Sequence, residues 1–339
     1  MEVDRLESNL LEIVNLTKHF LVKKGLIFQS SVGQVRAVDD VSFAIKPGKT
    51  LGLVGESGSG KTTISKMILG LYRPDSGQIF FKGTDLASSQ GSKLRSLRRS
   101  IGAVFQDPYA SLDPRMTIAD IVTEPMIVHN YLTAQERRLK LLELLEKVGL
   151  RQDDANRYPH QFSGGQRQRI AIARALALSP ELVISDEAVS ALDVSVQGKI
   201  VNLLMDLQEE LGLSYLFIGH DLNVVKQVSD EIAVMYLGRI VERGNAQEIF
   251  RNPRHPYTQA LIAAIPVADP KVMRARQLLI LQGEMPSALS PIGGCRFNSR
   301  CKFAQDVCRS ADPPLLEVDP GHFVACHFEA QIPRMASDD

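Results

Sequence analysis

The sequence feature that most constrains this chain is one glycine-rich segment. It reads Gly55, Glu56, Ser57, Gly58, Ser59, Gly60, Lys61 and Thr62, and it fits G-x-x-x-x-G-K-[ST]. The apolar run at 50–54 predicts a strand before it, and helical spacing of Ile64, Ile68 and Leu71 predicts a helix after it. This order points backbone N–H groups inward and adds a positive helix end, which favours phosphate. We therefore expect residues 55 to Thr63 to bind a nucleotide, with Lys61 on the β- and γ-phosphates and the Thr62 hydroxyl on Mg²⁺.

A second buried-strand pattern, at residues 182–184, ends in the acidic pair Asp186-Glu187. In open α/β sheets, ligands bind at the carboxyl ends of strands, so both acids are expected beside the phosphate loop. Asp186 suits a Mg²⁺ shell, and Glu187 suits polarising an attacking water. A solvated strand end is the alternative interpretation, and the phosphate loop upstream outweighs it.

Composition divides the chain near residue 250. Ten of the 17 prolines and all four cysteines lie after Arg251. We interpret 1–250 as a main α/β domain and 251–339 as a small Pro/Cys-rich extension.

The 39 Lys+Arg balance 39 Asp+Glu, which gives no support to a strongly electropositive nucleic-acid binder. No run approaches the roughly 20 apolar residues of a membrane span, and the acidic start does not resemble a secretion signal, so we expect a cytosolic chain.

Further motifs, taken in order with the phosphate loop and the Asp186-Glu187 pair, resemble those of the ABC ATPases over about residues 10–250. Gln106 looks like the Q-loop glutamine, and His220 looks like the switch histidine. The signature motif is matched by Ser163, Gly164, Gly165 and Gln166, where we expect a helix to start with Ser163 as its cap. The D-loop is matched by Ser190, Ala191, Leu192 and Asp193. Phe20 resembles the aromatic that stacks on adenine, although a core aromatic is the alternative. Family members often have proline where Ala188 stands, and both acids before it are kept.

The resemblance implies a P-loop NTPase core with an α-helical subdomain at about 107–160, where the spacing of Leu139, Leu142, Leu145 and Val148 predicts a helix over 133–150. It implies an ATPase whose catalytic residues are Glu187, His220 and Gln106: Glu187 activates water, His220 senses or stabilises the γ-phosphate, and Gln106 binds Mg²⁺ together with Thr62 and Asp186. It also implies a head-to-tail dimer, in which each signature covers the nucleotide held by the opposite subunit.

Two stretches are similar to the ATPases of oligopeptide/dipeptide importers: residues 105–116, and 252–261 at the start of the extension. This implies an ATP-hydrolysing subunit of a bacterial importer for peptides or related solutes, peripheral on the cytoplasmic face of the inner membrane. Its implied partners are membrane permease subunits, an extracytoplasmic solute-binding protein and a second ABC ATPase, with a heterodimer favoured over a homodimer. No nucleic-acid partner is expected. In such transporters the Q-loop and helical subdomain receive a permease helix. The candidate groove residues are Asp107-Pro108-Tyr109 and Leu112-Asp113-Pro114, with a solvent-facing loop as the alternative.

The four cysteines, Cys295, Cys301, Cys308 and Cys326, are spaced C-x5-C-x6-C-x17-C. Cytosolic disulfides are disfavoured, and the paired C-x2-4-C spacing of close Zn²⁺ sites is absent. Members of the resembled subfamily carry a [4Fe–4S] cluster on such an extension, and four thiolates match its need. An iron–sulfur cluster is therefore expected, with Zn²⁺ or unliganded thiols as alternatives.

Two rival functions are weighed. A soluble ABC ATPase of translation or DNA repair is disfavoured, because the chain has one phosphate loop and no long heptad run. A catalytically dead regulatory half-subunit is disfavoured by the presence of Gln106, Glu187 and His220.

Overall fold

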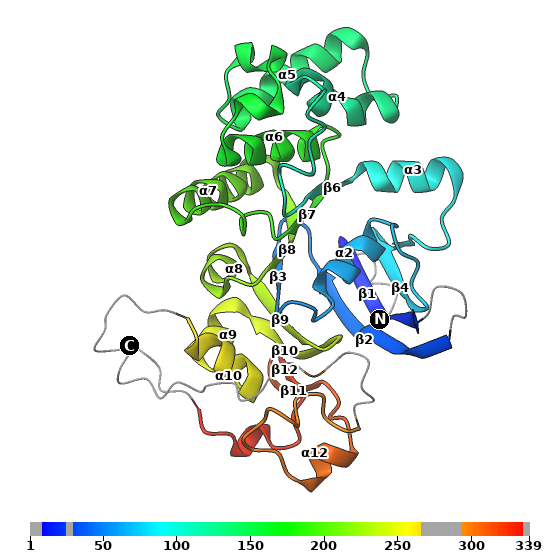
Figure 1. The fold of residues 1–339 in the computed structure, drawn as a ribbon, viewed down its shortest axis with the longest axis vertical. Coiled ribbons are helices and arrows are strands. Elements are labelled where there is room, and N and C mark those ends of the chain that lie inside the picture. Colours follow the sequence, from blue (N-terminus) through cyan, green and yellow to red (C-terminus); the bar gives the residue numbers. More distant parts are fainter. Residues whose placement is uncertain (1–8, 25–29, 266–285, 287–292, 335–339) are drawn as a thin grey trace. The chain divides into compact units, whose positions relative to one another are not determined.

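The computed structural model describes residues 9–24, 30–265, 286 and 293–334 (Figure 1). Contacts between residues divide the chain into two compact units, each built from several chain segments. Unit 1 contains residues 1–12, 44–50 and 80–219, and unit 2 contains 13–43, 51–79 and 220–339. Each unit contains both strands and helices.

The sheet of unit 1 is parallel and fully buried at its centre. Strands β6 (Ile101–Val104), β7 (Leu182–Asp186) and β8 (Ser214–Gly219) lie in the order β8-β7-β6. Every residue of β7 and β8 is buried, as expected for a parallel sheet covered on both faces. The end of β4 (Ser76–Phe81) pairs with the short β5 (Thr84–Asp85).

The helices of unit 1 include a group formed by α4 (Ile118–Val128), α5 (Ala134–Lys147) and α6 (Gly164–Leu176), which pack against one another (Figure 1). Capping boxes begin α4 at Thr117 and α5 at Thr133, so each helix start is encoded locally. The unit also contains α3 (Gly91–Arg99), α7 (Val194–Leu211) and two 3₁₀ turns at Gln152–Asn156 and Pro159–Gln161.

The main sheet of unit 2 joins the phosphate-loop strand to the C-terminal extension. Strand β3 (Thr50–Val54) pairs in parallel with β9 (Glu231–Tyr236), which pairs antiparallel with β10 (Arg239–Asn245). Strand β12 (His322–Val324) then pairs with β10 and with β11 (Leu316–Asp319). The extension therefore continues a sheet that the main domain begins.

The remaining elements of unit 2 include a second sheet, in which β1 (Leu11–Lys24) lies between β2 (Ser30–Ile45) and β4. Its helices are α2 (Lys61–Ile68), α8 (Leu222–Val228), α9 (Ala246–Arg251), α10 (Pro256–Ala263) and α12 (Asp306–Ser310), with a 3₁₀ turn at Glu329–Gln331.

Two expectations about helix faces are wrong. Helix α2 ends at Ile68, so Leu71 lies outside it and is 62% exposed. In α5, Leu139 is 63% exposed, and the buried residues are Leu141, Leu144 and Leu145. A stripe of leucines fits more than one face when neighbouring positions are also apolar, and packing partners decide which face is buried. Among the described residues, no helix is both long enough and apolar enough to cross a membrane.

Candidate nucleotide-binding site

The phosphate loop lies in unit 2, between β3 and α2, as predicted. The Lys61 ammonium is buried and donates hydrogen bonds to the carbonyls of Gly55 (2.7 Å) and Glu56 (2.9 Å) and to Ser59 Oγ (3.2 Å). The loop is thus curled around its own cation. Positive charge at the start of a helix is the arrangement that receives an anionic phosphate chain.

Two glycines make this curl possible. Gly55 has φ +150° and Gly60 has φ +109°, and both angles lie in the positive-φ half of the Ramachandran map, which residues with a side chain rarely adopt. A Cβ on Gly55 would lie 2.1 Å from the Met235 carbonyl oxygen, and one on Gly60 would lie 2.0 Å from that of Ala37. Both positions therefore require glycine for conformation and for space.

Unit 1 brings the Q-loop glutamine and the acidic pair to one edge of its sheet. Val104 of β6 is paired with Ser185 of β7 in parallel register. Gln106 and Glu187 each follow two residues later, so they leave the sheet at the same carboxyl edge. Gln106 is exposed and Asp186 is buried, with 5% of its surface exposed. This edge is where a parallel α/β sheet binds its ligands.

Glu187 is held in an uncommon backbone conformation. Its φ is +52°, and its N–H donates to the Ile218 carbonyl of β8 at 2.9 Å. Its own carbonyl accepts from Ser190 N at 3.1 Å and from Ser190 Oγ at 2.9 Å. Such a conformation in a non-glycine residue persists where the surroundings hold it, and it is concentrated at functional sites. The Ser190 contacts connect the D-loop motif directly to the acidic pair.

The signature motif begins α6, as the sequence predicted. Ser163 caps the helix: its Oγ accepts from Gln166 N at 3.4 Å, and Gln166 Oε1 accepts from Ser163 N at 3.0 Å. A Cβ on Gly164 would lie 3.4 Å from Leu192 of the D-loop, an ordinary contact, whereas one on Gly165 would lie 2.5 Å from Val196 Cγ1. The signature and D-loop motifs are therefore neighbours within unit 1.

The other expected nucleotide residues have less specific surroundings. Phe20 lies on β1, with its ring edge-on to Tyr72 at 5.3 Å and the Lys18 ammonium 5.6 Å from its centroid. His220 directly follows β8 and is exposed. The candidate groove residues differ from each other: Tyr109 is 63% exposed and stacks on Arg167 of α6 at 4.0 Å, but Leu112 is buried and cannot offer its side chain to a partner.

The four cysteines line one small cavity in unit 2, of about 20 Å³, with Phe297 and Phe303 among its other walls. Burial raises the pKa of Cys295 to about 12 and that of Cys326 to about 11, and it also raises the pKa of Cys301. Within the described ranges, no group of three or more His, Cys, Asp or Glu side chains could hold a metal ion. The structure therefore collects the thiols but does not support the expected iron–sulfur cluster.

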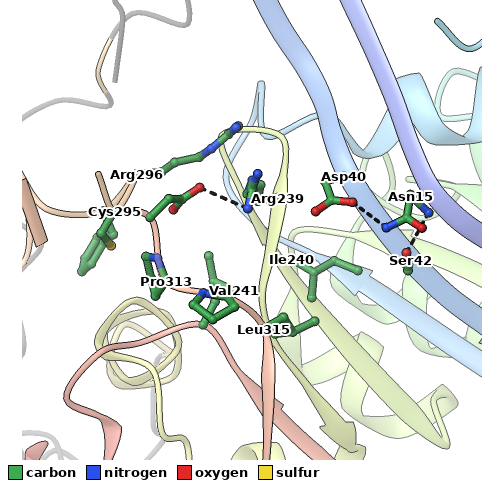
Figure 2. Close-up of a pocket in the computed structure, with 14 residues that line it drawn as sticks. Asn15, Asp40, Ser42, Arg239, Ile240, Val241, Cys295, Arg296, Pro313 and Leu315 are labelled. Carbon is green, nitrogen blue, oxygen red and sulfur yellow. Dashed lines mark hydrogen bonds and ion pairs between the residues drawn. The ribbon is translucent and has the colours of Figure 1, made fainter. Parts of the chain in front are cut away.

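A larger cavity of about 490 Å³ is lined by residues of β1, β2 and β10 and by extension residues between 295 and 325 (Figure 2). Polar groups in and beside its wall are paired: Arg239 with Asp312 at 3.1 Å, Asn15 with Asp40 at 2.7 Å, and Arg296 with Asp39. The Arg296–Asp39 pair joins the extension to β2, the Arg239–Asp312 pair joins it to β10, and none of these pairs uses an expected nucleotide residue.

Comparison with known proteins identifies the chain. Residues 38–190 match the ABC transporter family, and residues 241–308 match the family described as "oligopeptide/dipeptide transporter, C-terminal region". The chain is 51% identical over 323 residues to the oligopeptide transport ATP-binding protein AppF of Bacillus subtilis (strain 168), covering 95% of this chain and 98% of that relative. This chain is an ABC transporter ATP-binding subunit of the oligopeptide/dipeptide group.

Other relatives agree with this family assignment. The dipeptide transport ATP-binding protein DppF of Escherichia coli (strain K12) is 49% identical over 95% of each chain. A solved ATP-binding cassette dimer, in a post-hydrolysis state with ADP and Pi, matches with a TM-score of 0.61 and 33% identity, over 70% of this chain and 98% of that one. This ABC ATPase therefore has the P-loop NTPase fold that the sequence predicted, and it uses ATP and Mg²⁺.

Sequence reasoning missed two residues that contact the phosphate loop of this ABC ATPase. The Tyr257 hydroxyl accepts a hydrogen bond from Glu56 N at 2.9 Å, and the Arg300 guanidinium pairs with the Glu56 carboxylate at 3.0 Å. Tyr257 lies inside the 252–261 stretch that marks the subfamily, which was the available signal. Nothing local to Arg300 predicts a partner 244 residues away.

Proposed function

We propose that this ABC ATPase drives import of peptides or related small solutes, coupling ATP binding and hydrolysis to transport. The observation that carries the proposal is the pair of family matches, which places an oligopeptide/dipeptide C-terminal region behind an ABC cassette in one chain. On this view 1–250 is the ATPase domain, with the Q-loop and helical subdomain at about 107–160, and 251–339 is the extension.

The proposed ATP site assigns one task to each motif. Phe20 stacks on adenine, and residues 55–63 bind the phosphates, with Lys61 on the β- and γ-phosphates. Oxygen donors for Mg²⁺ come from Thr62, Gln106 and Asp186, the donor type that this hard cation prefers, and the bound ion supplies positive charge at the phosphates. Glu187 activates the attacking water, and His220 senses or stabilises the γ-phosphate. The common carboxyl edge of β6 and β7 supports the grouping of Gln106 with the acids.

The second half of each active site comes from a second ATPase subunit. The Ser163–Gln166 signature is proposed to act on the nucleotide of the opposite subunit, with the Ser190–Asp193 D-loop at the contact between them. Solved cassettes of similar fold are described as dimeric, which supports this assembly. A related but different ATPase is the favoured partner, and a second copy of this chain is the alternative.

The membrane partners are permease subunits, served by an extracytoplasmic solute-binding protein, and the ATPase lies peripherally on the cytoplasmic face of the inner membrane. The helical subdomain offers exposed apolar side chains, including Tyr109, Ile127 and Val128 at 53–63% exposure. A permease helix would cover them and gain their burial.

Purification of the native complex from membranes tests this assignment, followed by reconstitution and ATP-dependent peptide uptake. Tyr109→Asp should reduce recovery of the ATPase with the permease, whereas a charge change at exposed Lys93, on the separate helix α3, should not. Recovery with ribosomes or DNA, with no permease, would favour a soluble ABC ATPase instead.

For the cysteines we propose the finer assignment of a [4Fe–4S] cluster on Cys295, Cys301, Cys308 and Cys326. The support is that the four thiols line one cavity, which matches the number of thiolates that such a cluster needs. Protein purified without oxygen should be brown and contain about four irons per chain. Stoichiometric zinc, or no metal with four titratable thiols, would contradict the cluster and leave the ATPase assignment unchanged.

A further inference from the structure

Every polar group of Glu56, the second residue of the phosphate loop, is engaged. Its N–H donates to the Tyr257 hydroxyl at 2.9 Å, and its carboxylate accepts from Arg300 at 3.0 and 3.1 Å. Its carbonyl accepts from the Lys61 ammonium at 2.9 Å. The first two partners belong to the C-terminal extension, and the third is the loop's own cation. One residue therefore connects the extension to Lys61.

The support behind these contacts is rigid. Tyr257, Tyr236 and Phe297 form a cluster of three rings with centroid separations of 4.7 to 5.5 Å, and none is more than 2% exposed. The Arg300 side chain is 7% exposed and lies against this cluster, 5.9 Å from the centroid of Tyr236. Because packed aromatic rings have few alternative rotamers, the two groups that touch Glu56 are held in place before any ligand arrives.

These contacts fix the orientation of the Gly55–Glu56 peptide group. The Glu56 N–H donates to Tyr257 of the extension, while the Gly55 and Glu56 carbonyls both accept from Lys61. A loop held in this way does not have to order its backbone when phosphate binds, and the avoided entropy cost appears as affinity.

We propose that Arg300 and Tyr257 are positioning residues for nucleotide binding: the extension holds Glu56, and Glu56 holds Lys61 where it receives the phosphates. This inference rests on the proposed assignment of residues 55–63 as the phosphate-binding loop. It gives the extension a task in the ATPase cycle that does not depend on any metal bound by the cysteines.

The test is titration of the full-length chain with a non-hydrolysable ATP analogue and Mg²⁺, together with steady-state hydrolysis. Arg300→Met should raise the Kd and the KM for ATP about tenfold, as loss of a charge-assisted hydrogen bond predicts. Tyr257→Phe keeps the ring cluster and removes only the acceptor of Glu56 N–H, so a rise of about threefold is expected. Arg300→Lys should recover part of the affinity. In each case kcat at saturating ATP should stay within about twofold of wild type, because neither residue touches the reacting atoms.

The matched control is Arg309→Met. Arg309 also belongs to the extension, but its side chain is 69% exposed and pairs with Asp306 of its own helix at 3.0 Å. It should leave the ATP affinity unchanged. Lys61→Ala is the reference for the loop itself: if it binds ATP normally, the assignment of the loop fails, whereas normal binding by Arg300→Met alone overturns only the positioning role.

A double-mutant cycle separates positioning from general destabilisation. If Arg300 acts through Glu56, the Arg300→Met and Glu56→Gln double variant should bind ATP as tightly as the single variant that has the larger loss of affinity. Additive losses would overturn the proposal. If Arg300→Met fails to fold, Arg300→Lys with Glu56→Gln gives the same cycle, because Arg300 is the residue that contacts the Glu56 carboxylate, and it decides the question.

Discussion

Two glycine-rich segments start helices in this ABC ATPase, and they are built differently. In the phosphate loop, Gly55 and Gly60 need positive φ, no side chain caps α2, and Lys61 is folded onto the loop carbonyls. In the signature, Ser163 and Gln166 form a capping box, and Gly164 and Gly165 have ordinary φ angles. The first loop is shaped to surround an anion. The second is capped, and its small residues allow close approach, which suits contact with a nucleotide held by another chain.

The largest expected effect separates holding ATP from hydrolysing it. Glu187→Gln should lower turnover about a thousandfold, because the amide keeps the shape and loses the charge that orients water. ATP binding should be preserved, and the dimer should stay closed with ATP. Steady-state hydrolysis and oligomeric state in ATP measure both effects. Wild-type turnover would remove Glu187 from the chemical step.

The next prediction sets the two glycine-rich segments against each other. Lys61→Ala should weaken ATP binding to the isolated chain by roughly 100-fold, since the phosphates lose their charge-assisted partner. Gly164→Asp should leave that binding nearly intact and abolish cooperative turnover of the assembled complex, because its carboxylate would repel the γ-phosphate of the opposite subunit. Equal loss of isolated-chain binding in both variants would mean that the signature serves its own subunit.

A smaller effect is expected on stability within the signature. Gly165→Ala should lower the free energy of unfolding by about 1–2 kcal/mol, because the added Cβ overlaps Val196 Cγ1. Gly164→Ala should be neutral or stabilise by up to about 1 kcal/mol, because its Cβ has room and alanine favours a helix. Urea unfolding of both variants gives the comparison. Equal changes would show that the signature glycines are not kept for close packing.

A further prediction concerns pH and the support of the phosphate loop. His255 caps α10, the helix that carries Tyr257, by accepting a hydrogen bond from Tyr257 N at 3.1 Å. Burial lowers the pKa of His255 to about 4, although the nearby Glu242 carboxylate acts to raise it. The unfolded chain therefore takes up this proton first, and stability should fall as pH falls from about 6.5 to 4, by up to about 3 kcal/mol. His255→Asn keeps a cap and should flatten this part of the stability–pH curve. An unchanged curve would contradict the shifted pKa.

Local patterns predicted the parts of the site that depend on local structure. Strand β3, the phosphate loop, strand β7 with its acids, and the Ser163 cap all follow from residues within a few positions of one another. The faces of α2 and α5 were wrong at Leu71 and Leu139, because periodicity alone does not show which neighbours pack on a helix. The contacts of Tyr257 and Arg300 with Glu56 join residues more than 200 positions apart, and no single-sequence pattern encodes such a pairing.

Strand β12 has a consequence for how the chain is made. Residues 322–324 pair with β10, so within unit 2 the edge of β10 is covered only by a segment close to the end of the chain. During synthesis, β10 emerges from the ribosome about 80 residues before this cover, and until then it presents unpaired backbone groups to any other strand. The outer strand that finally forms the edge, β11, is four residues long and carries Glu317 and Asp319, which discourage pairing with another chain. A chain that stops at the end of the cassette would keep all its ATPase motifs and still be the more prone to aggregate.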